Sequence, residues 1–188
     1  MKRIISALLA MAVLSAVSSG AVLADEKKAL TTALPSKSAS AWDQPRFELK
    51  GLDGKTHSLD EWKGKVILMN FWASWCAPCQ YEIPEFVKYQ KQYGDRGLQI
   101  IGIGIDEEKK LRNVARSLDI NYPVLVADPG DPAHIKILEQ WGNEKQFIPY
   151  TVVIRKDGRI SYIHRGMLDE EAFKEYVRPV LDASEEGA

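Results

Sequence analysis

The chain has 188 residues, 45% of them hydrophobic, and is therefore long enough to bury the core of one domain without added cross-links. Its 25 basic and 26 acidic side chains nearly cancel, which excludes the basic surface that nucleic-acid binding requires. There are two cysteines and no internal repeat, so the functional information in this sequence is local.

Residues 1–24 have the pattern of a secretory signal peptide. Lys2 and Arg3 precede an apolar run over residues 4–17, and Val22-Leu23-Ala24 fits the small-residue pattern of a cleavage site. An uncleaved membrane anchor is the alternative, although the run is short for a bilayer span, which needs about 20 residues. No cysteine follows the run, so a lipoprotein anchor is excluded. The pattern predicts export to the periplasm.

A flexible leader is predicted over residues 25–41, which are rich in Lys, Ser, Thr and Ala. Its alternative role is a tether that holds the domain near a membrane. The domain itself is predicted to span residues 42–188. It opens with a β-hairpin, because residues 46–49 and 55–58 flank a turn rich in glycine.

The next segments lead from a short helix to a buried strand. Ser58 and Glu61 have the spacing of a capping box, which predicts a helix of about one turn. The apolar run at residues 65–71 predicts the strand. Directly after it, the stretch Phe-Trp-Ala-Ser-Trp-Cys-Ala-Pro-Cys at residues 71–79 opens a helical pattern that ends at Gly94. The strand therefore delivers two cysteines to a helix N-terminus.

This placement of Cys76 and Cys79 predicts thiol chemistry. The partial positive charge and free N–H groups of a helix N-terminus stabilise a thiolate, so we expect a lowered pKa for the Cys76 thiol. Cys79 follows one turn later, where it can close a disulfide onto Cys76. The pattern predicts dithiol–disulfide exchange, with Cys76 as the attacking thiolate and Cys79 as the resolving thiol.

Two other readings of the cysteine pair are open. A purely structural disulfide is the first, but closing so short a loop removes little entropy from the unfolded chain. A zinc site is the second, and it would need two more ligands from His57, His134 and His164, none of which has ligand spacing to another. We therefore predict no metal site and no cofactor.

The stretch at residues 71–79 resembles the active site of the thioredoxin superfamily. With the predicted signal peptide, it most resembles the TlpA/ResA/CcmG-type thiol-disulfide oxidoreductases of the bacterial envelope, over roughly residues 47–181. The resemblance implies an α/β, thioredoxin-like fold: a central mixed sheet flanked by helices, with an N-terminal β-hairpin and an α/β insertion. It also implies that Trp75, Ala77 and Pro78 contact the substrate.

Proton transfer needs a group other than the one used by thioredoxin. Asn70 stands six residues before Cys76, where thioredoxin itself has an acid, and an amide cannot take a proton. Glu82 is the candidate, because it follows Cys79 by one helical turn and matches an acid of the envelope family in a C-x-x-E-x-P run. Partial burial would raise the pKa of its carboxyl group. The alternative is a solvated glutamate on the helix face.

Strand and helix patterns alternate through the rest of the chain. Strands are predicted at residues 98–105, 122–127, 151–154 and 160–164, and helices after residue 106, at 131–141 and from Asp169 onward. Within the first of these strands, Gly102 and Gly104 lack the spacing of a dinucleotide fingerprint. The segment 98–141 resembles the inserted α/β unit of the TlpA-like group. The last helix is predicted to bury Ala172, Phe173, Tyr176, Val177 and Val180.

Pro149 stands just before the predicted strand at residues 151–154. It resembles the cis-proline of the family, which faces the dithiol. The resemblance implies a cis peptide bond after Ile148 and a backbone at Ile148 that pairs with an extended substrate segment.

Together these features predict a periplasmic reductase of disulfides in exported proteins, with the CxxCH haem sites of apocytochrome c among the candidate substrates. The resemblance implies a membrane electron donor of the DsbD/CcdA type, and we expect a monomer. An oxidant or isomerase of disulfides is one alternative, because the reduction potential sets the direction of exchange. A redox-inactive module that binds peptides is another. A peroxidase is disfavoured, because no threonine-containing loop precedes the cysteine.

Overall fold

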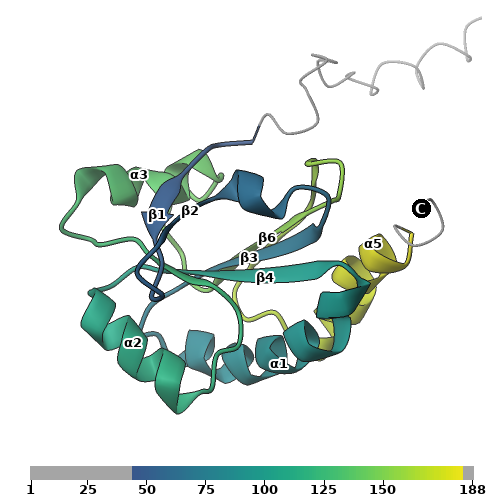
Figure 1. Cartoon of the computed structure of the whole chain (residues 1–188), viewed down its shortest axis with the longest axis horizontal. Coiled ribbons are helices and arrows are strands. Elements are labelled where there is room, and N and C mark those ends of the chain that lie inside the picture. Colours follow the sequence, from purple (N-terminus) through teal and green to yellow (C-terminus); the bar gives the residue numbers. More distant parts are fainter. Residues whose placement is uncertain (1–43, 184–188) are drawn as a thin grey trace, which may run out of the picture. The chain divides into compact units, whose positions relative to one another are not determined.

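A computed structural model describes residues 44–183; the predicted signal peptide and leader lie outside the described residues. A five-stranded sheet with the order β5-β4-β3-β6-β7 forms the centre of the fold (Figure 1). Its strands are β3 (Val66–Trp72), β4 (Leu98–Gly104), β5 (Val124–Val126), β6 (Tyr150–Ile154) and β7 (Ile160–Arg165). The sheet is mixed, as predicted: β3, β4 and β5 run parallel, whereas β6 is antiparallel to both β3 and β7.

Helices cover both faces of this sheet (Figure 1). One face carries α1 (Ala77–Tyr93), α2 (Glu108–Ser117) and the C-terminal helical segments, and the other carries α3 (Pro132–Gln140). The C-terminal segments are α4 (Glu170–Ala172), η3 (Phe173–Val177) and α5 (Arg178–Asp182), and a short η2 (Gly94–Arg96) follows α1. Among the described residues no helix is long and apolar enough to cross a membrane.

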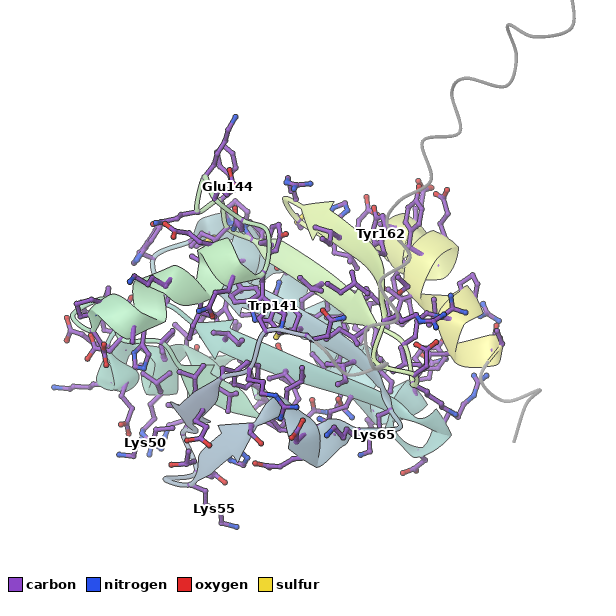
Figure 2. The ribbon with its side chains drawn as sticks, turned by 90° about the horizontal axis from the view of Figure 1, so that it is seen from above. Lys50, Lys55, Lys65, Trp141, Glu144 and Tyr162 are labelled. Carbon is purple, nitrogen blue, oxygen red and sulfur yellow. A yellow bond between two sulfur atoms is a disulfide. The ribbon has the colours of Figure 1, made fainter. Side chains whose placement is uncertain are left out.

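The side chains of β3 alternate between the two faces, as the period of a strand requires. Val66, Leu68 and Trp72 belong to the core beneath α1, whereas Met69 and Phe71 belong to the core beneath α3. Trp141, at the end of α3, is buried in this second core (Figure 2). The alternation directs every second residue of β3 toward the helix that carries the cysteines.

The predicted N-terminal hairpin consists of β1 (Glu48–Lys50) and β2 (Thr56–Ser58), followed by the 3₁₀ helix η1 (Leu59–Trp62). The backbone N–H of Ser58 donates to the Glu61 carboxylate at 2.9 Å, the contact expected of the capping box. The hairpin turn also covers the outer edge of β5, because Leu52 N–H donates to Val124 O at 2.9 Å. This contact blocks part of an edge that could otherwise pair with another chain.

The prediction for the last helix is wrong at Tyr176. Buried apolar residues recur every four positions, at Phe173, Val177 and Leu181, while Tyr176 is 37% exposed. Tyr176 lies in the π-helical turn η3, next to this stripe and outside it. Tyr176 instead stacks on Tyr162 of β7, with ring centroids 3.9 Å apart.

Candidate active site

The two cysteines lie where β3 passes into α1. Cys76 is the N-cap residue of α1, and the backbone N–H of Cys79 donates to its sulfur at 3.3 Å. The two sulfurs form a disulfide, with the Cα atoms 5.3 Å apart. Cys79 is fully buried, whereas 5% of Cys76 is exposed. Of the two cysteines, only Cys76 therefore offers any surface to an incoming sulfur.

The loop before Cys76 is held by two side chains from outside it. The Ser74 hydroxyl donates to the carboxylate of Asp106, and the Gln80 amide donates to Ser74 O at 2.6 Å. Asp106 is buried directly after β4. Burial alone would raise the pKa of Asp106, but hydrogen bonds from Ser74 and the Glu107 backbone hold that pKa below its ordinary value. An ionised carboxylate thus braces the loop that presents the reactive sulfur.

The loop before β6 lies at the same end of the sheet. The peptide bond between Ile148 and Pro149 is cis, as the resemblance implied. Tyr150, the next residue, pairs with Phe71 near the end of β3, so the register brings Pro149 to the edge where the dithiol begins. Ile148 is half-buried and packs against the apolar cluster that contains both cysteines.

The buried amide of Asn143 fixes this proline loop. Its Nδ2 donates to Phe147 O at 2.6 Å, and its Oδ1 accepts from Phe147 N–H at 3.0 Å. On the other side, Gly166 N–H donates to Pro149 O at 2.9 Å. The loop is thus attached to the end of α3 and to the end of β7.

Glu82 is buried in the core beneath α1, with 2% of its surface exposed, which removes the alternative of a solvated glutamate. Asn70 Nδ2 donates to its Oε1 at 2.8 Å, and the backbone N–H of Leu168 donates to its Oε2 at 2.8 Å. Burial raises the pKa of this carboxyl group to about 7, although both hydrogen bonds oppose the rise. The side chain can therefore both accept and release a proton near neutrality.

Residues 43–163 match the profile of the AhpC/TSA family. The chain belongs to this family. Proteins similar to it include the thioredoxin-like protein YneN of Bacillus subtilis, 33% identical over 135 residues, which are 70% of this chain and 74% of YneN. Another is the thiol-disulfide oxidoreductase ResA of Bacillus thuringiensis, 29% identical over 73% of this chain and 76% of ResA.

Solved structures of thiol:disulfide interchange proteins are also similar to this chain. A putative thiol:disulfide interchange protein DsbE from Chlorobium tepidum has a TM-score of 0.64 at 25% identity, over 73% of this chain and 94% of that one. A thioredoxin family protein from Chlorobium tepidum TLS has the same TM-score and coverage at 32% identity. The fold is therefore thioredoxin-like, and the chain is a thiol-disulfide oxidoreductase with its cysteine pair at disulfide distance.

In this thioredoxin-like fold the residues singled out from the sequence gather at one end of the sheet. Trp75, Ala77 and Pro78 are exposed around Cys76, and Pro149 is buried in the neighbouring loop. His57 instead bonds Asp53 and Glu61 in the hairpin. Within residues 44–183 no group of three or more His, Cys, Asp or Glu side chains is arranged to hold a metal ion.

Three residues hold parts of this oxidoreductase site in place, and that role was not predicted from the sequence. Asp106 braces the Ser74 loop, Asn143 fixes the proline loop, and Asn70 holds Glu82. Only Asn70 had a usable signal, since strand alternation places it on the α1 face with Trp72. The other two act through contacts that the spacing of residues does not encode.

Proposed function

We propose that this protein reduces disulfides in exported proteins. The observation that supports this best is the unequal exposure of the two cysteines, with a small part of Cys76 open to solvent and Cys79 fully buried. When the pair is reduced, the positive end of α1 favours the thiolate of Cys76. A substrate disulfide can approach that thiolate, while Cys79 stays inside to complete the reaction.

In the proposed reaction, the Cys76 thiolate attacks one substrate sulfur, and the other substrate sulfur leaves as a thiolate that takes up a proton. Cys79 then loses its proton and attacks the Cys76 sulfur. The mixed disulfide breaks, the second substrate thiol is released, and the Cys76–Cys79 disulfide forms. We propose that Glu82 takes the proton of Cys79, since it lies one turn further along α1 and has a pKa of about 7.

The proposed substrate contacts lie on both sides of Cys76. Trp75, Ala77 and Pro78 offer exposed surface next to the sulfur. At the edge formed by the proline loop, the backbone of Ile148 would pair with an extended segment of the substrate, as in strand addition. Pro149 would hold this edge against the dithiol.

We further propose a periplasmic location and a membrane electron donor of the DsbD/CcdA type. The predicted signal peptide at residues 1–24 supports export, and an oxidising compartment lacks the reducing thiol pool of the cytosol. Apocytochrome c with an oxidised CxxCH site is one candidate substrate. Fractionation followed by mass spectrometry tests the location: the expected species is periplasmic and begins at Asp25, whereas an intact chain in the membrane fraction supports the anchor.

A trapping experiment tests the exchange chemistry. Cys79→Ser should accumulate a mixed disulfide with insulin through Cys76, because the resolving thiol is missing. The control Cys76→Ser should form none. If a Cys76→Ala/Cys79→Ala variant retained all partner binding and the wild type reduced no insulin, the peptide-binding module would replace the reductase.

The reduction potential of the Cys76–Cys79 couple tests the direction of exchange. We expect a value near that of thioredoxin, roughly −270 mV, because a reductase must give up its electrons readily. A value near roughly −120 mV, like that of the oxidant DsbA, would instead favour the oxidant. Equilibration with glutathione or dithiothreitol buffers, followed by alkylation, measures it.

A further inference from the structure

Two large aromatic side chains near the cysteine pair are exposed to solvent: Trp75 is 71% exposed and Tyr81 is 78% exposed. They border a hollow of about 410 Å³ lined by Trp75, Ala77, Gln80, Tyr81, Pro84 and Leu118. We propose that this hollow receives a bulky apolar side chain of the partner polypeptide, close in sequence to the cysteine that exchanges with Cys76. The proposal rests on the proposed exchange function and names a feature of its partners.

The chemistry of the walls favours an apolar group. None of the six lining side chains is charged, and the one amide, that of Gln80, already donates to Ser74 O at 2.6 Å. On α1, Glu82 is turned into the core, and the next charged residues, Glu85 and Lys88, pair with each other at 2.5 Å. Exposed aromatic side chains around a concave, uncharged surface are typical of the anchor sites of protein interfaces.

The position of the hollow favours a polypeptide that brings a sulfur. Trp75 and Ala77 are the chain neighbours of Cys76, and both line the hollow, so it adjoins the more exposed of the two cysteines. The hollow lies between α1 and the end of α2, whereas the proline loop belongs to β6 on the opposite side of β3 in the sheet. A partner segment that crosses Cys76 could therefore be held on both sides of its own cysteine.

The hollow is seen here in the disulfide form of the protein, which is the form that an electron donor reduces. A donor thiolate attacks the Cys76 sulfur, the bond to Cys79 breaks, and Cys79 leaves as a thiolate that takes up a proton. A second donor thiol loses its proton and attacks the mixed disulfide. The donor dithiol is thereby oxidised to a disulfide, and Cys76 and Cys79 become thiols.

The experiment measures how fast dithiol peptides reduce the disulfide form of the protein. The peptides carry Cys-Gly-Gly-Cys flanked on both sides by either phenylalanine or glycine, and dithiothreitol serves as a small donor. We expect the phenylalanine peptide to react about tenfold faster than the glycine peptide, a difference equal to about 1.4 kcal/mol. Tyr81→Ser/Leu118→Ser should lose this preference and keep the wild-type rate with dithiothreitol.

Two further variants serve as controls. Tyr81→Ser alone changes a side chain that is mostly in solvent, so it should fold and lose part of the preference. Ile160→Ser removes an exposed apolar side chain at the opposite end of the sheet, where β7 pairs with Ile154, and should keep the full preference.

Several outcomes overturn the proposal. One is a wild type that reacts equally fast with both peptides. Another is a Tyr81→Ser/Leu118→Ser variant that still prefers the phenylalanine peptide, or that also reacts more slowly with dithiothreitol. Binding to phosphatidylglycerol vesicles that Tyr81→Ser abolishes would assign the aromatic pair to a membrane instead. Failure of the exchange function gives a different result, because the wild type would then reduce no insulin whatever the peptides show.

Discussion

At the scale of single residues, the carboxyl group of Glu82 couples the ionisation of the site to the stability of the fold. Its pKa in the folded protein is about 7, above the ordinary value of 4.5. Between those two pH values the folded protein binds more protons at this site than the unfolded chain. The contribution of Glu82 to the free energy of unfolding must therefore fall as the pH rises through this window, and it is lost above about pH 7.

The first prediction concerns Glu82→Gln, which removes this titration. Between pH 4.5 and 8 the wild type should lose about 3 kcal/mol more of its free energy of unfolding than the variant does, as expected for a shift of this size. Urea unfolding of the disulfide form across this range measures both curves. Parallel curves would show that Glu82 does not titrate as described.

The second prediction concerns Asn70→Leu. Asn70 donates a hydrogen bond that favours the charged form of Glu82, so its loss should move the pKa of Glu82 further above 7. Titration of carboxyl-labelled glutamate by NMR measures the shift. Thr151→Val is the matched control, because Thr151 contacts Asn70 at 3.1 Å and makes no bond to Glu82. A lower or unchanged pKa in Asn70→Leu would contradict the assigned role.

The residues of the site were predictable only as far as local patterns reach. Cys76, Cys79 and the helix position of Glu82 follow from the sequence around them. The burial of Glu82 depends on contacts from β3 and from Leu168, which is 86 residues away. The spacing of residues does not reveal a contact between such distant positions. A raised pKa for Glu82 could therefore be predicted, but its hydrogen bond from the Leu168 backbone could not.

At the scale of elements, the glycines of β4 explain how closely the helices pack on the sheet. A Cβ atom at Gly102 would lie 2.9 Å from Trp72 Nε1 and 3.4 Å from the Tyr122 ring. One at Gly104 would lie 2.5 Å from the Leu111 side chain of α2. The sequence could exclude a dinucleotide site here, but the actual reason for these glycines is tertiary packing.

The third prediction follows from this packing. Gly102→Ala should lower the free energy of unfolding by about 1–3 kcal/mol, because the added methyl group overfills a closed core against a fully buried Trp72. Urea unfolding at fixed pH measures the change. Asn113→Ala, on the exposed side of α2, should change it by less than about 0.5 kcal/mol. A neutral Gly102→Ala would mean that Trp72 can move aside.

The order of elements along the chain was predictable, but their arrangement in space was only partly so. Every strand of the sheet appears within a few residues of its predicted place, because each is an apolar run between turn residues. The exposure of Tyr176 was not predictable, since its stacking on Tyr162 of β7 leaves no mark in the apolar pattern. The mixed sheet was implied by the family resemblance alone, and its strand order was not predicted.

At the scale of the whole molecule, the sheet separates two apolar cores that must both be buried. Ile83 of α1 lies in one core and Leu138 of α3 in the other. The fourth prediction is that Ile83→Ala and Leu138→Ala each cost about 2–5 kcal/mol of the free energy of unfolding. Because the sheet lies between them, the double variant should equal the sum within about 0.5 kcal/mol.

Denaturant unfolding of the two single variants and the double variant completes this cycle. A coupling above about 1 kcal/mol would show that the sheet transmits repacking from one face to the other. A biphasic transition would show instead that the two cores unfold separately.

The burial of Cys79 has a consequence for how the molecule meets its partners. With one sulfur accessible, the protein that supplies electrons and the protein that receives them must bond the same atom, and so cannot be bonded to it together. Turnover must alternate between the two encounters, each completed before the next begins. Such a ping-pong cycle gives parallel lines in double-reciprocal plots, and either partner in excess competes for the form that the other requires.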